Sequence, residues 1–240
     1  MYVDPAVSLA QARVLSRQAD ADNAYRPGAR ARNDDVARTH TASRPMLDPL
    51  SVVAPADAYF LTNGSDGRRS YTRDGSLAVH DGRLVDGSGR PVLGTVGGEP
   101  MPQELRIDPV DVALGRARDL RIEADGHLVY DRRVVEPRTG TAAQQRVVVG
   151  RILLARFPAG TRLEPVDASH GGAPVGIVPH VGRPGDGNFG SLEPFARDEG
   201  GIDTDRSLDR LRQAYLALDA MRAAQVARAG VSKTAIDLLK

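Results

Sequence analysis

The chain has 240 residues, 41% of them hydrophobic and 26% charged, which is enough for one or two domains with a hydrophobic core. Its 32 basic and 31 acidic residues leave a formal net charge of +1, and the basic residues are scattered, so no nucleic-acid partner is predicted. The absence of cysteine excludes a disulfide framework and a thiolate site. No apolar stretch approaches the roughly 20 residues that span a bilayer, so no membrane insertion is predicted.

Residues 5–24 are predicted to form a helix. Asp4 suits the N-cap position, and Pro5 suits the first helical position because its missing N–H has no partner there. Leu9 and Val14 belong to an apolar stripe that is thin and rich in alanine. A helix of this kind needs a packing partner to be stable.

This helix is expected to end near Asn23, because neither Pro27 nor Gly28 continues a helix. The polar stretch that follows has no periodicity and is typical of a connector. We therefore assign residues 1–35 to a first helical segment and residues 36–47 to a linker.

From residue 48 to residue 200, short apolar runs alternate with turn signals. The predicted strands are Leu50–Ala54, Tyr59–Thr62, Ser70–Thr72, Leu77–His80, Arg83–Val85, Val92–Leu93, Leu105–Ile107, Leu120–Glu123, His127–Tyr130 and Val147–Phe157. Closely spaced strands without intervening helices favour antiparallel pairing. Asp81-Gly82 suits a two-residue hairpin turn. Residues 164–190 are rich in Gly and Pro and are expected to form a long surface loop.

Residues 204–229 return to helical periodicity, in a C-terminal segment assigned to residues 201–240. Gly230 is expected to interrupt this helix before a last turn at 233–239. One face of the helix carries Leu208, Leu211, Tyr215, Leu218 and Met221. A β domain with a helix at each end is therefore predicted.

The order of residues from Tyr71 to Gly94 closely resembles the central signature of the bacterial flagellar rod and hook proteins. In that family a Tyr-Thr-Arg-x-Gly strand leads into an apolar hairpin and then a Gly-x-Pro-Val-Leu-Gly strand. The match has no gaps over about two dozen positions. The matching residues include Tyr71, Thr72, Arg73, Gly75, Gly82, Gly89, Pro91, Val92 and Gly94.

The resemblance extends beyond this signature. Residues 49–61 and 150–158 resemble an early and a late strand of the family. Residues 23–30 resemble the end of its asparagine-rich motif, and 211–218 are similar to its glutamine-arginine-x-tyrosine helix without strict identity. The departures from the family pattern thus fall mainly in the two helices.

The resemblance implies a mainly β central domain, antiparallel and hairpin-rich, flanked by N- and C-terminal α-helices that pair as an assembly domain. It implies a structural subunit of the flagellar basal-body rod rather than an enzyme. The implied partners are other rod and hook subunits, further copies of the chain, and the flagellar type III export apparatus. The implied location is the periplasmic rod, reached without a cleaved signal peptide. A length of 240 residues leaves no room for the inserted outer domain of hook subunits, which favours the proximal- and distal-rod proteins.

Two alternatives remain at this point. One is a diverged paralogue that keeps the β fold without polymerising. The other is a β-type carbohydrate- or calcium-binding module with dimerising helices. A binding module needs no helix at each end of the chain, which favours the rod interpretation.

Three groups of polar residues suggest catalytic or metal chemistry, and each has a simpler interpretation. The Asp-Gly pairs resemble calcium ligands, but they lack EF-hand spacing and suit tight turns. The carboxylates of Glu164, Asp167 and Glu193 are not specific for glycoside hydrolysis, because surface carboxylates are common. Ser169 and His170 are next to each other in sequence, whereas triad members usually come from separate loops. No catalytic residue, metal ligand or cofactor is predicted.

Overall fold

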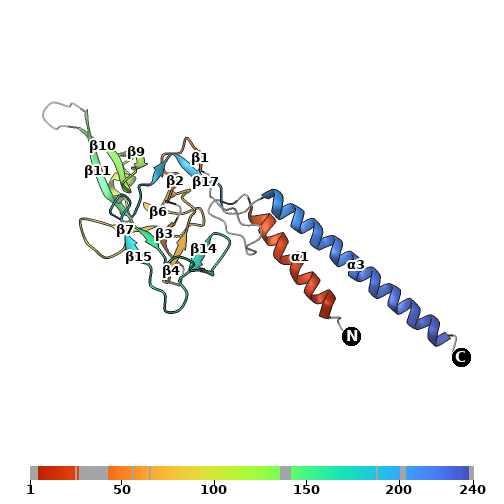
Figure 1. Ribbon diagram of the computed structural model, residues 1–240. Coiled ribbons are helices and arrows are strands. Elements are labelled where there is room, and N and C mark those ends of the chain that lie inside the picture. The colour runs from red at the N-terminus through yellow and green to blue at the C-terminus, as the bar shows by residue number, and fades with distance from the viewer. Residues whose placement is uncertain are drawn as a thin grey trace. The chain divides into compact units, whose positions relative to one another are not determined.

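The computed structural model describes residues 5–24, 26, 43–55, 57–64, 66–135, 142–187, 189–200 and 204–237. It divides into two compact units, which are described separately (Figure 1). The helical unit contains α1 (Pro5–Asn23) and α3 (Thr204–Asp237). The β unit contains strands β1 to β17 and the short helix α2 (Pro109–Ala113). The protein is thus mainly β, with a helix near each end, which confirms the predicted class.

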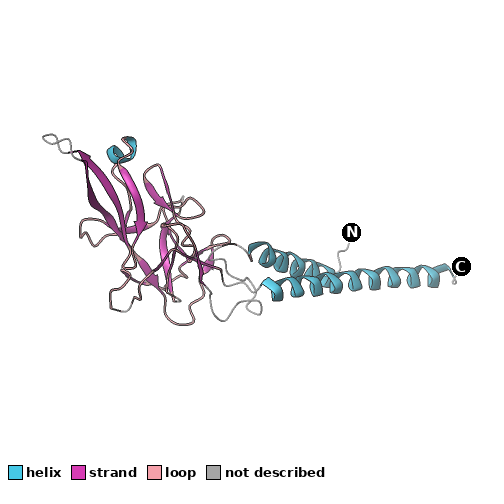
Figure 2. Ribbon diagram, turned by 90° about the horizontal axis from the view of Figure 1, so that it is seen from above, coloured by secondary structure: helices cyan, strands magenta, loops and turns pink. Residues whose placement is uncertain are grey.

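The two long helices lie side by side and run antiparallel (Figures 1 and 2). Val7, Ala10 and Val14 of α1 pack against Ala214 and Leu218 of α3. Because each helix contributes a small alanine side chain to this contact, the contact buries few apolar atoms. Among the described residues, no helix combines the length and apolar character needed to cross a membrane.

The expected break at Gly230 is wrong, because α3 is one continuous helix from Thr204 to Asp237. A glycine inside a helix costs only about 1 kcal/mol relative to alanine, and the alanines before it favour helix. By contrast, α1 ends at Asn23 as expected, and the Asn23 side chain donates a hydrogen bond to the carbonyl of Ala19.

Antiparallel sheets make up the β unit. The first, six-stranded, has the order β13 (Glu164–Pro165), β14 (His170–Gly172), β4 (Arg69–Thr72), β3 (Ala58–Asn63), β12 (Leu154–Arg156) and β15 (His180–Gly182). The second, five-stranded, has the order β8 (Gln103–Glu104), β7 (Leu93–Thr95), β11 (Ala142–Ile152), β10 (His127–Val135) and β9 (Ala117–Ile122). The remaining strands pair in twos: β1 (Ser43–Pro45) with β17 (Ala196–Asp198), β2 (Val52–Val53) with β16 (Glu193–Pro194), and β5 (Ala78–His80) with β6 (Arg83–Val85).

One continuous stretch of chain joins the two larger sheets. The sequence predicts a single strand, Val147–Phe157, but the strand divides at Leu153. On one side of this residue Ile152 pairs with Gly94 of β7, and on the other Leu154 pairs with Phe60 of β3. The strand therefore leaves one sheet and enters the other within two residues.

The six-stranded sheet buries apolar side chains on both faces, because successive residues of a strand point to opposite sides. Phe60 and Leu154 belong to the larger hydrophobic cluster, whereas their neighbours Leu61 and Ala155 belong to the smaller one. We call the smaller cluster, with its buried members Leu61, Tyr71, Leu93, Leu153, Ala155 and Leu163, the Tyr71 cluster.

The expected surface loop over residues 164–190 is wrong. Strands β13, β14 and β15 all lie within it and extend the six-stranded sheet at both ends. These strands have two or three residues each, too few to show alternating hydrophobicity. Similarly, β1 lies inside the stretch expected to be linker, where Ser43 pairs with Asp198.

A fragment of residues 43–200 is expected to unfold in one cooperative transition, because its clusters and sheets are continuous. A fragment of residues 48–200 loses β1, including the hydrogen bond from the Met46 N–H to the Phe195 carbonyl, and should melt at a lower temperature. Calorimetry on both fragments measures this. A gradual, non-cooperative melt of the longer fragment would contradict the unit assignment.

Candidate functional site

The Asp81-Gly82 turn has the geometry that the sequence predicts. Both residues have positive φ, 50° and 72°, and His80 pairs with Arg83 across the turn. This is the conformation that favours Asp-Gly in two-residue hairpin loops. The middle of the family-like signature is therefore a hairpin with a structural explanation.

Most of the other signature residues are buried in the β unit. Tyr71 is 5% exposed and packs edge-on against Phe157, with ring centroids 4.9 Å apart. Thr72 donates a hydrogen bond from Oγ1 to the Ser169 carbonyl at 2.9 Å. Val92 is fully buried in the larger cluster. Pro91 forms an isolated bridge with Val85.

Three signature glycines have separate reasons to be glycine. Gly89 has a φ of 78°, which L side chains rarely adopt. A Cβ at Gly94 would lie 2.5 Å from the Arg151 carbonyl oxygen. A Cβ at Gly75 would lie 1.7 Å from the Val52 carbonyl oxygen. A turn and two close backbone approaches therefore explain these three glycines.

Replacing Gly75 with alanine is expected to destabilise the β unit by about 3 kcal/mol, because β2 has to move away from the new methyl group. Gly172→Ala is the matched control. A Cβ at Gly172 meets its nearest atom at 3.6 Å and its φ is not positive, so that change should be neutral or slightly stabilising. Chemical denaturation of both variants measures the difference, and equal stabilities would contradict the close approach at Gly75.

Arg73, the central residue of the signature, lies in a buried charged network. Its Nε donates to Asp198 Oδ2 at 2.9 Å, and the two side chains are 6% and 0% exposed. Its Nη1 donates to the carbonyls of Pro55 and Ala58, and its Nη2 to that of Ala54. The guanidinium therefore connects the residue directly after β4 with Ala54, Pro55, Ala58 and β17.

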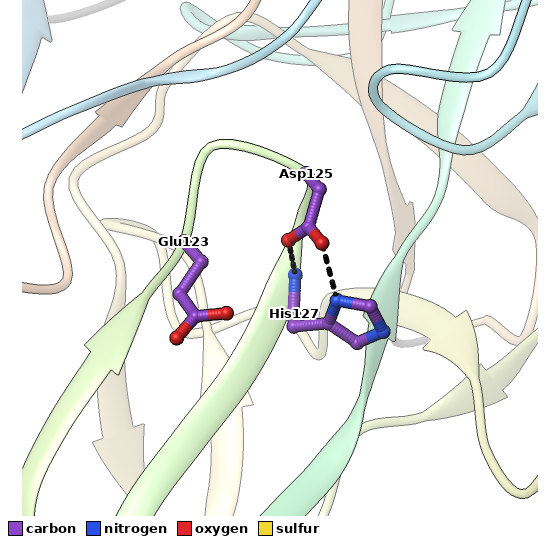
Figure 3. A group of neighbouring side chains, drawn as sticks. All are labelled: Glu123, Asp125 and His127. Atoms are coloured by element: carbon purple, nitrogen blue, oxygen red, sulfur yellow. Dashed lines mark hydrogen bonds and ion pairs between the residues drawn. The ribbon is translucent and has the colours of Figure 1, made fainter.

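Glu123, Asp125 and His127 surround the β9–β10 turn and have the donor atoms of a metal site (Figure 3). Their ligand atoms lie within 4.8 Å of one another. Each is already engaged within the protein: Glu123 accepts from Arg146 at 2.6 Å, and the Asp125 carboxylate bonds both the N–H and Nδ1 of His127. Burial by itself raises the pKa of Asp125. The hydrogen bonds from His127, of which that of Nδ1 has the larger effect, and the charges of His127 and Arg151 outweigh burial and lower the pKa. We interpret these hydrogen bonds and this ion pair as interactions that stabilise the β9–β10 turn.

Ser169, His170 and Asp167 do come together, but Asp86 joins them from 84 residues away. His170 Nε2 lies 2.7 Å from Asp86 Oδ2, and Nδ1 lies 2.9 Å from Asp167 Oδ1. A histidine bonded to carboxylates through both nitrogens has no free lone pair to take a serine proton. The arrangement does not support nucleophilic catalysis. Sequence inspection missed Asp86, for which no local pattern gives a signal.

An open depression of about 620 Å³ lies between β9, β10 and β11. Its lining holds two arginines and one carboxylate, with neither serine nor histidine: Arg118, Asp131, Arg133, Ala142, Ala143 and Gln144. Asp131 is paired with Arg121. Among the described lining residues none is a serine, threonine or histidine, and the one carboxylate is already held in an ion pair, so the depression gives no support for catalysis.

The residues expected on the assembly helices differ in how far they are buried. Val14 and Leu218 are 5% exposed and form the contact between α1 and α3, together with Val7, Ala10 and Ala214. Leu211 is half-buried. The side chains that remain exposed are Leu9, Leu208, Tyr215 and Met221. Pro27 and Gly28 lie outside the described residues.

Leu208, Tyr215 and Val226 are exposed apolar residues on another side of α3, where the charged Asp219 lies between Tyr215 and Val226, and we call these three residues the α3 stripe. Their exposed fractions are 49%, 44% and 73%. Spacings of 7 and 18 residues place them on the same side of an α-helix, within about 20° per heptad. The stripe lies beside, not within, the face that contacts α1.

Comparison with known proteins gives no assignment. No family model matches the chain, and no curated protein matches it.

Proposed function

We propose that the chain is a non-catalytic structural subunit of a bacterial flagellar basal-body rod, in which α1 and α3 form the assembly domain. The α3 stripe is the observation that supports this proposal most directly. Exposed apolar side chains in line on one helix favour a protein partner over solvent. The partners would be neighbouring rod subunits or further copies of this chain.

The dimensions of the helical unit support the same proposal. The 34 residues of α3 give roughly 51 Å of helix, and the 19 residues of α1 give roughly 28 Å. Figures 1 and 2 show α3 continuing past the N-terminal end of α1. A long helix with a short, alanine-rich partner gains most of its stability from further packing.

The β unit contributes the resemblance on which the flagellar assignment rests. The signature residues Tyr71, Arg73 and Gly75 have roles in the fold of this chain: a buried ring, a buried guanidinium and a close backbone approach. Residues with such roles help to determine the path of the backbone. The order in which they occur along the chain is therefore evidence for a particular fold. In the proposal, delivery to the periplasmic rod takes place through the flagellar type III export apparatus.

The test is to express the chain with a small internal tag in its source bacterium and to purify flagellar basal bodies. The tagged protein is expected in the purified basal bodies at a fixed ratio to known rod subunits. Deletion of its gene should abolish flagellar filaments and swimming. Recovery of the protein only outside basal bodies, with normal swimming of the deletion strain, would reject the rod proposal and favour a non-polymerising paralogue or a binding module.

A further inference from the structure

His170 joins its own hairpin to a segment that is 84 residues away in sequence. Its side chain is fully buried on β14. Asp86, in the turn after β6, faces Nε2, and Asp167, in the turn before β14, faces Nδ1. When both carboxylates are ionised, they accept hydrogen bonds from both ring nitrogens only if each nitrogen carries hydrogen, which is the charged imidazolium.

The charges around His170 balance only when it is protonated. Arg90 donates from Nη2 to Asp167 Oδ2 at 2.7 Å and from Nη1 to Ser70 Oγ at 2.9 Å. Asp86, Asp167, Arg90 and the imidazolium thus sum to zero. A neutral imidazole would leave one carboxylate charge without compensation beside a buried ring.

Further charged groups lie at the edge of this set. Burial raises the pKa of Asp74, with the charge of Asp86 adding to the increase and Arg197 opposing it. Ser169 Oγ lies 3.2 Å from His170 Nδ1. A second carboxylate near Asp86 makes an uncompensated negative charge here still less favourable.

Titration of His170 has a defined direction. Burial by itself lowers the pKa of the imidazole, but the hydrogen bonds and charges of Asp86 and Asp167 outweigh burial and raise it above 6.5. A group with a raised pKa in the folded state contributes its stabilisation fully below the unfolded value, and loses it as pH rises through the folded value. The interaction therefore weakens on the alkaline side.

The segment that His170 fastens is a small hairpin at the edge of the six-stranded sheet. Its strands β13 and β14 span residues 164–172, and β14 joins the sheet through the pairs His170–Thr72 and Gly171–Tyr71. Leu163, directly before the hairpin, is 7% exposed and belongs to the Tyr71 cluster. This hairpin thus closes one side of that cluster.

We propose that the β13–β14 hairpin is a pH-sensitive flap over the Tyr71 cluster, held closed by the charged form of His170 and released when that proton is lost. Release hydrates Asp86, Asp167 and the neutral imidazole together, which removes the cost of the uncompensated buried charge. The β14–β4 pairs, the hydrogen bond from Thr72 to the Ser169 carbonyl, the ion pair between Arg90 and Asp167 and the packing of Leu163 oppose release.

Hydrogen exchange on the full chain, corrected for the intrinsic effect of pH, tests the flap. From about pH 6 to about pH 9, protection of residues 163–172 in the native protein should fall by about tenfold or more, while β10 and β11 stay protected. His80→Gln, at a histidine whose side chain is 77% exposed, is the control and should behave like the native protein. In His170→Gln the flap should exchange rapidly at both pH values.

A second variant keeps the proposal testable if His170→Gln fails to fold. Asp167→Asn removes one of the two carboxylates and should move the pH midpoint of flap opening to lower pH. The imidazole chemical shifts of His170 should titrate with the same midpoint as the loss of protection, in the native protein and in Asp167→Asn. Protection that is independent of pH in the native protein, or a midpoint that Asp167→Asn leaves unchanged, would overturn the proposal.

Discussion

Replacement of Asp198 with asparagine is expected to lower the free energy of unfolding of the β unit by about 3–5 kcal/mol. The variant keeps the size of the side chain but leaves the Arg73 guanidinium, 6% exposed, without its counter-charge. Removing one member of a buried pair is costly because the other charge stays desolvated. For a unit of this size, the loss corresponds to a melting temperature lower by about 6–20 °C.

The matched control is Glu104→Gln, which neutralises a carboxylate paired with Arg83 and Arg106 near the surface. The two arginines are 42% and 56% exposed, so solvent screens these pairs, and the expected cost is below about 1 kcal/mol. Urea denaturation of both variants followed by circular dichroism gives the comparison. Similar losses for Asp198→Asn and Glu104→Gln would mean that the Arg73 network contributes no more than a surface pair.

A double variant shows what Arg73 does beyond neutralising Asp198. Replacing a buried ion pair with apolar residues often leaves the free energy of unfolding unchanged. If the pair were the whole interaction, Arg73→Met combined with Asp198→Leu would therefore be as stable as the native protein. Arg73 also donates to the carbonyls of Ala54, Pro55 and Ala58, which the methionine leaves without these donors. We therefore expect the double variant to remain destabilised.

The sequence was most informative where structure is local. The φ angles of Asp81 and Gly82 follow from the residue types, and the hairpin between β5 and β6 follows from the turn. The bounds of α1 agree with the prediction from Pro5 at its start and from Pro27 and Gly28 beyond its end. In each of these cases the interactions that determine the structure lie within a few residues of chain.

It was least informative where long-range pairing decides the structure. β13 and β15 are strands only because β14 and β12 lie beside them. The partners of His170 and Arg73 lie 84 and 125 residues away, so no spacing rule reveals them. Leu218 and Tyr215 belong to the same helical periodicity, and only the position of α1 decides that Leu218 is buried and Tyr215 exposed.

Replacement of both Leu208 and Tyr215 with glutamate is expected to abolish incorporation of the protein into basal bodies. Two carboxylates on the α3 stripe would have to be desolvated in an interface that covers it, which is strongly unfavourable for a charge without a partner. Both side chains are exposed in the helical unit, at 49% and 44%, so melting of the β unit and of the helices should be unchanged.

The control variant carries the same added charge on the same helix. Ala220→Glu with Ala224→Glu changes two exposed positions that helical periodicity places on a side of α3 away from both the stripe and α1. Leu218→Glu is unsuitable because it also breaks the contact between α1 and α3. Loss of incorporation in the stripe variant alone would identify that line as the assembly surface. Equal loss in the alanine-site control would show only that added charge on α3 is not tolerated, and normal incorporation of the stripe variant would assign assembly to another surface.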